Sequence, residues 1–273
     1  MGINVIVDYY QDDRPARADE FFLCLRHNLK HPEVEAVWNL GGDASSLPDD
    51  IRQHRKYRHE RSADRLTFRR AIDFANARLA GKFVGIINLD IYIGTTAASW
   101  GEAEQLVRDK DIVLCQARSE LNADGTVSRD PGFQRYAFST AQDGWFFVPP
   151  LEVENISFEV GTLGCDNAFA HRLQAAGKVP LNLGTRLPII HVDICRGKDA
   201  ANTLAAHKAE HDQRKATYSS FPEREGWYFV PDFDLICDLE TLANDLKLDP
   251  LQKYKVKCEL MSQVMGVDNE RNV

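Results

Sequence analysis

The alternation of short apolar runs with longer segments of helical spacing constrains the fold of this chain more than any other feature of its sequence. The longer segments, at about 17–30 and 66–79, carry apolar residues three and four positions apart, which is typical of amphipathic helices. Strands and helices that alternate in this way form mostly parallel sheets covered on both faces, so we expect an α/β fold. The strand-like runs are INVIV (3–7), VEAVWNL (34–40), VGII (84–87), IVLCQA (112–117) and PIIHVDI (188–194).

The composition is that of an ordinary globular protein. Of the 273 residues, 44% are hydrophobic and 27% are charged. No apolar stretch approaches the roughly 20 residues that cross a bilayer. The amino-terminal sequence MGINVIVDYYQDD has neither a basic region nor a long apolar segment, so we expect a cytoplasmic protein without a membrane span. The six cysteines include no CxxC pair, which argues against a zinc ribbon or a disulfide framework.

The charge is distributed unevenly along the chain. A net charge of −8 argues against general attraction to nucleic acid or to an anionic membrane. Between Arg52 and Arg70, however, eight of nineteen residues are Lys or Arg and two are acidic. Such a run is usually a solvated surface, but this one precedes a predicted strand and could contact a phosphate.

The apolar run at 84–87 ends in Asn88, Leu89 and Asp90. A strand covered on both faces is a continuous apolar run, and its carboxyl end is where open α/β sheets bind ligands. Asp90 is therefore expected in a functional site. The alternative is that Asp90 stabilises a turn through its own backbone, as Asp and Asn often do after strands.

Three later motifs place polar residues at the ends of predicted elements. Asp166 and Asn167 follow a pair of glycines and open a predicted helix, where Asp is also a favourable N-cap. His191 ends a short strand and is either a buried core histidine or a ligand for a divalent metal. Asp143 and Trp145 precede an aromatic strand.

The order and spacing of these motifs resemble those of nucleotide-sugar glycosyltransferases of GT-A fold. The resemblance covers about residues 3–196, and each motif is short. The matching segments are R-A-D-E (17–20), R-L-T-F (65–68), N-L-D (88–90), Q-D-G-W-F-F (142–147), G-C-D-N (164–167), A-G-K-V-P-L-N (176–182) and I-I-H (189–191).

The resemblance implies a GT-A-like, Rossmann-type, mostly parallel sheet flanked by helices. It also implies transfer of a sugar from a nucleotide-diphosphate sugar, with uridine or guanosine as the base, to a hydroxyl group. The acceptor stays open among a glycan, a lipid, a protein and a modified nucleobase, as do the stereochemistry and the oligomeric state. The composition changes near Pro222, so we expect a main domain at 1–221 and a small extension of strand and helices at 222–273.

The resemblance further implies roles for individual residues. Asp90 would hold Mn²⁺ or Mg²⁺ against the diphosphate, with His191 as the second protein ligand. Asp166 would be catalytic, either taking the proton of the acceptor hydroxyl or stabilising the sugar cation. The residues expected to bind the nucleotide sugar are Tyr9 (stacking on the base), Arg65 (at the diphosphate), Arg118 and Asp143 (at the donor-sugar hydroxyls), Asn88 and Asn167.

Two positions depart from the family pattern. Asn88 stands where the first carboxylate of a DxD motif is usual, so the metal would have one carboxylate fewer. Asp193 stands where the group often has a second histidine, which leaves the ligand open between His191 and Asp193.

Two other classes of protein fit parts of the sequence. The segment H-K-A-E-H at 207–211 matches the HxxEH motif of inverted zinc peptidases, in which two histidines on one helix face bind zinc. Stoichiometric zinc that resists chelation would favour that class. A binding module that has kept the fold and lost the chemistry is the third alternative. Hydrolysis of a nucleotide sugar without acceptor would argue against it.

Overall fold

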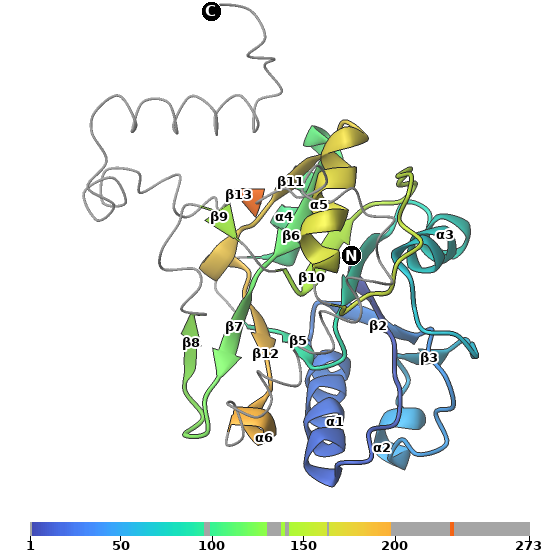
Figure 1. Cartoon of the computed structure of the whole chain (residues 1–273), viewed down its shortest axis with the longest axis vertical. Coiled ribbons are helices and arrows are strands. Elements are labelled where there is room, and N and C mark those ends of the chain that lie inside the picture. Colours follow the sequence, from blue (N-terminus) through green and yellow to red (C-terminus); the bar gives the residue numbers. More distant parts are fainter. Residues whose placement is uncertain are drawn as a thin grey trace, which may run out of the picture.

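The computed structural model describes residues 2–95, 99–129, 138–139, 142–162, 164–197 and 230–231. Over these ranges the chain forms a mixed α/β fold with a large, mostly parallel sheet flanked by helices (Figure 1), which confirms the predicted fold class. The H-K-A-E-H segment, the proposed boundary at 221/222 and nearly all of the proposed extension lie outside the described residues.

The large sheet has seven strands, and β10 is the one that runs antiparallel to its neighbours β4 and β6. The chain adds β2 and β3 on one side of β1 and places β4 on the other. The strands, in their order across the sheet, are β11 (Val179–Leu181), β6 (Ile112–Gln116), β10 (Gly144–Phe147), β4 (Phe83–Ile87), β1 (Ile3–Val7), β2 (Val34–Asn39) and β3 (Tyr57–His59).

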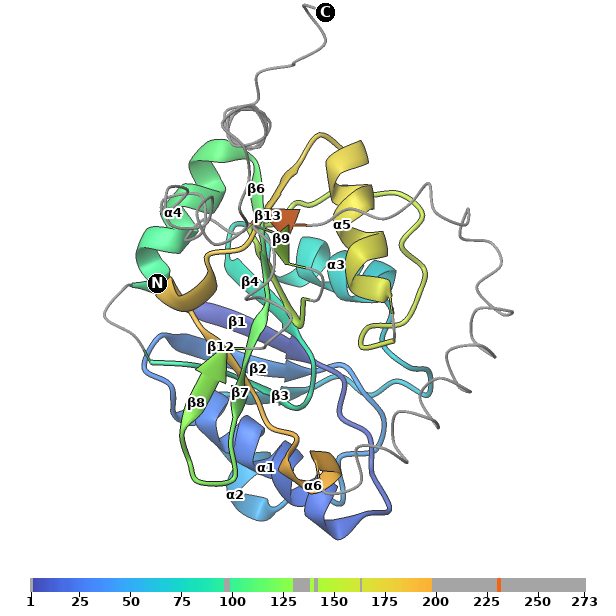
Figure 2. The same cartoon turned by 60° about the vertical axis from the view of Figure 1, so that its left-hand side comes forward.

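Helices cover both faces of this sheet, which explains why its central strands are continuous apolar runs. Alternate residues of β1 enter different cores: Val5 and Val7 pack on one face, and Ile6 packs on the other. The first core is completed by α1 (Pro15–Lys30), α2 (Asp49–Arg52) and α4 (Trp100–Lys110). The second is completed by α3 (Phe68–Arg78) and α5 (Cys165–Ala175), which lie together in both Figure 1 and Figure 2.

A smaller four-stranded sheet stands beside the large one, at the lower left of Figure 1. Its strand order is β5 (Ile91–Ile93), β12 (Ile189–His191), β7 (Arg118–Leu121) and β8 (Val127–Arg129). The chain passes directly from β4 to β5 and from β6 to β7, so the residues between these strands lie where the two sheets meet. The remaining elements are the β9–β13 pair (Phe138–Ser139 with Val230–Pro231), the 3₁₀ turn η2 (Gly184–Arg186) and α6 (Ile194–Gly197).

The helices of the described ranges are all too short or too polar to cross a membrane.

Candidate functional site

The predicted site residues gather at the carboxyl ends of β1 and β4. These two strands are adjacent and parallel, and the strand order reverses between them, because the chain continues from β1 toward β2 and β3 at one edge of the sheet and from β4 toward β6 and β10 at the other. Ligands of open α/β sheets bind outside the strand ends at such a switch point. Asp8 and Tyr9 follow β1, and Asn88, Leu89 and Asp90 follow β4.

The side chains of Asp90 and His191 are in direct contact. The Oδ2 atom of Asp90 lies 3.2 Å from Nε2 of His191, and the Nδ1 atom of His191 lies 2.7 Å from Oε2 of Glu120. His191 is paired in register with Glu120 across β12 and β7, so the two residues share a face of the smaller sheet. His191 is 3% exposed and therefore sits between two carboxylates in a largely dry environment.

The two carboxylates determine the charge of His191. Burial alone lowers the pKa of the imidazole, but the hydrogen bonds to Asp90 and Glu120 outweigh burial and raise that pKa to about 9. With no metal ion bound, a pKa of about 9 favours the imidazolium form of His191 at neutral pH.

Arg17 supplies a second positive charge to Asp90. The guanidinium forms an ion pair with Asp90, lies 2.8 Å from Oε2 of Glu20, and donates a 2.8 Å hydrogen bond to the Val192 carbonyl. It also lies 3.5 Å from Oδ1 of Asp193. The Arg17 side chain is 3% exposed, so it is a buried cation surrounded by acceptors. Burial disfavours its charge, but the partners, Asp90 first, more than compensate and raise the pKa of Arg17.

The network continues on the other side of His191. Arg118 bridges two carboxylates, with Nε 2.6 Å from Oε1 of Glu120 and Nη1 2.9 Å from Oδ2 of Asp143. The amide nitrogen of Asn88 donates to Oδ1 of Asp143. A continuous series of contacts therefore joins Arg17, Asp90, His191, Glu120, Arg118, Asp143 and Asn88.

The other amide atom of Asn88 is an unused acceptor. Its Oδ1 is buried and has no hydrogen-bond partner among the described residues. It faces Gly161, where a Cβ atom would come within 3.1 Å of that oxygen. Gly161 also has a φ of 76°, a conformation that favours glycine. An unpaired acceptor of this kind is costly to bury, and a ligand hydroxyl is one group that would satisfy it.

Asp166 lies beside this network at the start of α5. The expectation that it is the N-cap is wrong, because α5 begins at Cys165 and its N-cap is Gly164, with a φ of 84°. Asp166 is instead in the first helical turn, where its Oδ2 accepts a 3.2 Å hydrogen bond from the backbone nitrogen of Gln142. Burial, with the charge of Asp143 as a smaller contribution, raises the pKa of Asp166 to about 6. Asn167 is buried next to it.

The aromatic residues after β1 are arranged differently from the prediction that Tyr9 stacks on the base of the donor. Tyr9 is 2% exposed, and its hydroxyl lies 2.8 Å from Oγ of Ser46, so its ring is enclosed. Arg65 lies 2.8 Å from Oδ2 of Asp8, and its guanidinium lies 4.6 Å above the ring of Tyr10. Tyr10 is therefore the better-placed aromatic residue at this strand end. The sequence signal for it is the Tyr9–Tyr10 pair, in which Tyr9 is fully buried and Tyr10 is half-buried against Phe21.

Sequence reasoning also did not place Arg17 and Glu120 in the candidate site, where both contact the charged network. Arg17 was part of a matched motif, but its position in an amphipathic helix gives no sign of burial. The alternative metal ligand, Asp193, lies 3.5 Å from the Arg17 guanidinium. It groups with Glu20 and Cys195, and the ligand-type atoms of these three residues lie within 4.8 Å of one another. The Glu20 carboxylate accepts from the Cys195 backbone nitrogen at 2.8 Å.

No family model and no curated protein sequence matches this chain. Among solved structures, the chain is similar to HddC from Yersinia pseudotuberculosis, at 12% identity and a TM-score of 0.40, over 70% of this chain and 93% of that one. It is also similar to a Bacillus anthracis protein described as a glucose-1-phosphate thymidylyltransferase, in complex with a sucrose, at 9% identity and a TM-score of 0.43, over 75% of this chain and 95% of that one. At these identities and TM-scores the two structures say nothing about the activity of this chain.

Proposed function

We propose that the protein is a glycosyltransferase that moves a sugar from a nucleotide-diphosphate sugar to a hydroxyl group of an acceptor. The observation that carries the proposal is the continuous network from Arg17 to Asn88 at the carboxyl ends of β1 and β4. Breaking a bond between a sugar and a diphosphate requires positive groups where negative charge develops and polar groups that orient the sugar. This network combines buried cations with carboxylate and amide acceptors.

The donor would lie along the strand ends. The Arg65 side chain is 44% exposed, so its guanidinium is available to a diphosphate, with the base near Tyr10 and Tyr9. Asn88, Arg118, Asp143 and Asn167 would contact the donor sugar. Among these, the unpaired Oδ1 of Asn88 is the clearest available acceptor for a sugar hydroxyl.

Asp166 would act on the acceptor. A carboxylate whose pKa is about 6 is ionised at neutral pH and is more basic than an ordinary Asp. It is therefore suited to take the proton of an attacking hydroxyl or to stabilise positive charge on the sugar.

Asp90 and His191 would hold Mn²⁺ or Mg²⁺. Their Oδ2 and Nε2 atoms are 3.2 Å apart, close to the ~3 Å that separates neighbouring ligands of an octahedral cation with bonds of about 2.1 Å. The donor set of one carboxylate and one imidazole thus fits a divalent cation. When bound, such a cation neutralises charge on a leaving diphosphate. Its binding has to compete with Arg17 for Asp90 and with a proton for His191.

Thermal-shift measurements with a panel of uridine and guanosine diphosphate sugars, with and without Mn²⁺, test the donor. A ligand at a hundredfold its dissociation constant stabilises by about 2.7 kcal/mol, which is easily detected. Arg65→Ala should reduce this stabilisation, and Arg78→Ala, an exposed arginine at the end of α3, serves as its matched control. Release of the nucleoside diphosphate from the preferred donor then tests for turnover.

The same measurements separate the alternatives. A donor that binds but is neither hydrolysed nor transferred to any acceptor would indicate a binding module. Absence of binding across the panel, combined with stoichiometric zinc, would contradict the glycosyltransferase proposal and favour the peptidase motif at 207–211.

A further inference from the structure

A cavity of about 650 Å³ lies on the opposite side of the smaller sheet from the candidate site. Tyr92, Ile190 and Ser119 are paired in register across β5, β12 and β7, and all three line the cavity. Their sequence neighbours His191 and Glu120 are paired with each other and belong to the charged network. Successive residues of a strand point to opposite faces, so the sheet separates the cavity from the network.

The walls of the cavity are held in place by buried hydrogen bonds. Asn28, which is 1% exposed, donates to the carbonyl of Ile91 at 2.9 Å and accepts from the nitrogen of Ile93 at 2.9 Å. These two bonds fasten the end of α1 to β5. The nitrogen of Gly94 donates to the carbonyl of Pro188 at 2.9 Å, which ties β5 to the segment before β12. The cavity is thus largely preformed, as ligand pockets usually are.

The charge of the lining is opposite to that of the chain. The net charge of the protein is −8, yet none of the described residues around the cavity is Asp or Glu. Lys30 lies at its edge and has no ion-pair partner within the described part of the chain. The polar groups that line the cavity are His27, Lys30, His31, Thr95, Ser119 and Ser128. His31 is already engaged, because its Nδ1 accepts from the Glu33 nitrogen at 3.2 Å. The others offer one cation, an imidazole and three hydroxyls, which suits a ligand with a single anionic group and hydroxyls.

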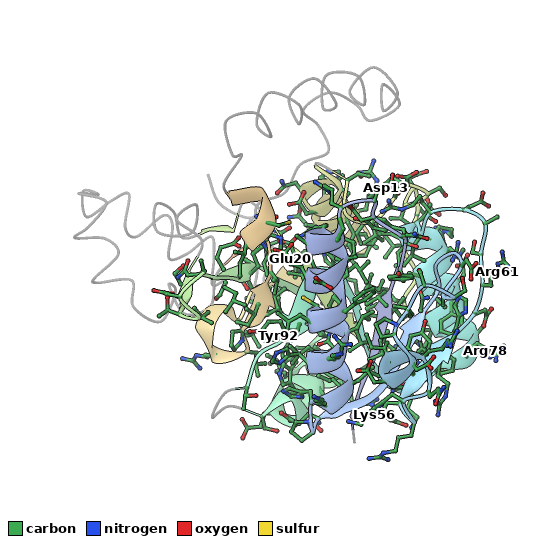
Figure 3. All side chains as sticks on the ribbon, turned by 90° about the horizontal axis from the view of Figure 1, so that it is seen from below. Asp13, Glu20, Lys56, Arg61, Arg78 and Tyr92 are labelled. Carbon is green, nitrogen blue, oxygen red and sulfur yellow. The ribbon has the colours of Figure 1, made fainter. Side chains whose placement is uncertain are left out.

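The cavity also has an apolar edge. The ring of Tyr92 stacks on that of His27, with ring centroids 4.4 Å apart and planes inclined by 23°. Figure 3 shows Tyr92 beside α1, toward the opposite end of that helix from Glu20. Val127 is 51% exposed and lines the cavity, and it is the large hydrophobic side chain left exposed among the described residues. Val127 and Tyr92 therefore give this polar cavity an apolar surface that a ligand can contact.

We propose that this cavity binds a small, hydroxyl-bearing anion of the size of a sugar, either a sugar phosphate or a sugar acid. The volume is within the range of about 300–1,000 Å³ of small-molecule pockets. Lys30 contacts the anionic group, the hydroxyl groups of the lining bond those of the ligand, and Tyr92 and Val127 pack against its carbon skeleton. The site is independent of the proposed function, because no residue of the charged network lines it.

Calorimetric titration at low salt with four probes tests the proposal: glucose 6-phosphate, glucuronate, glucose and inorganic phosphate. We expect at least one of the two acidic sugars to bind at millimolar concentration, about tenfold more tightly than glucose or inorganic phosphate. Preference for glucose 6-phosphate identifies a phosphate-bearing ligand, and preference for glucuronate identifies a carboxylate. Equal binding of glucose, equal binding of inorganic phosphate, or no binding of either acidic sugar overturns the proposal.

Substitutions assign the binding to this cavity. Lys30→Gln should weaken binding about fivefold, the upper end for one solvent-facing charge pair, while Lys110→Gln, at the end of α4, should not change it. Because Val127 is exposed, Val127→Glu and Val127→Lys should fold normally, and they should shift the affinity in opposite directions. Arg65→Ala, at the donor site, should leave the binding unchanged. An affinity that responds to Arg65→Ala but not to Lys30→Gln or to the Val127 pair overturns the assignment.

Discussion

Oδ2 of Asp90 and Nε2 of His191 lie 3.2 Å apart, although 101 residues separate them in the sequence. Asp90 follows the central strand of the large sheet, and His191 ends a strand of the smaller one. Their contact therefore fixes one sheet against the other at the candidate site. The Val192 nitrogen donates to the Asp90 carbonyl at 2.9 Å and reinforces the same junction.

The protonation of His191 should make the stability of the metal-free protein depend on pH. Folding raises the pKa of His191 from 6.5 to about 9, so the folded state binds the proton more tightly than the unfolded chain. The resulting stabilisation is complete below about pH 6.5 and is lost as the pH rises through about 9. At about 1.4 kcal/mol per unit, the loss is about 3 kcal/mol. Urea unfolding in chelator, at about pH 6 and about pH 9.5, measures it.

The control for this prediction is His191→Gln, which cannot titrate. The variant should lack the part of the pH dependence that belongs to His191. If wild type and variant lose the same stability between the two pH values, the imidazole is not protonated in the folded protein.

Arg17 should contribute strongly to stability, because it is a buried cation with several partners. Arg17→Met removes the cation that pairs with Glu20 and one of the two cations beside Asp90, the other being His191, and breaking a buried pair in this way costs about 3–5 kcal/mol. The matched control is Arg14→Met in the same region. The Arg14 side chain is 59% exposed and lies 2.7 Å from Asp12, so its loss should cost less than about 1 kcal/mol. Similar unfolding free energies for the two variants would contradict the buried role of Arg17.

The sequence predicted those strands and helices whose own residues form a recognisable hydrophobic pattern. β1, β4 and β6 are buried along their whole length, and each is an apolar run. In the smaller sheet only β12 lies in a predicted run, at 188–194, whereas β5, β7 and β8 are three or four residues long and too short to be recognised. Its strands are specified by pairing with distant segments, which periodicity along the chain does not reveal.

The residues of the candidate site also fall into those that a local sequence pattern predicts and those that it does not. Asp90 and His191 could be predicted because Asp90 closely follows an apolar strand and His191 ends one. The burial of Arg17 could not, since an arginine in an amphipathic helix usually faces solvent. The helix start was misplaced because Gly164, a glycine with positive φ, is the N-cap of α5, so the helix begins at Cys165, one residue before Asp166. The pairing of Glu120 with His191 depends on the register of β7 and β12, which no local pattern encodes.

Metal removal should abolish donor binding if Asp90 and His191 hold a cation. We expect excess chelator to eliminate the Mn²⁺-dependent thermal shift produced by the donor, and Asp90→Ala to do the same in the presence of Mn²⁺. Asp73→Ala, an exposed carboxylate of α3, is the control and should retain the shift. Full activity in excess chelator would defeat the metal assignment, and the charge of the diphosphate would then be balanced by arginines alone.

The ionisation of Asp166 should determine how turnover falls at acid pH. Its pKa of about 6 means that the carboxylate form, which accepts a proton or stabilises a sugar cation, is lost as the pH falls below 6. Turnover should therefore rise with pH and level off above about pH 7, and Asp166→Asn should cost about a hundredfold or more in kcat, the usual scale of general acid–base catalysis.

The Asn side chain has nearly the same size as Asp and can still accept the hydrogen bond from the Gln142 nitrogen, so the melting temperature of the variant at neutral pH should not fall. Burial disfavours the ionised Asp166, so the variant should be at least as stable as wild type above about pH 6, and melting curves across the pH range serve as the control. An Asp166→Asn protein that turns over at the parent rate, with the same acid limb, would remove Asp166 from the chemistry.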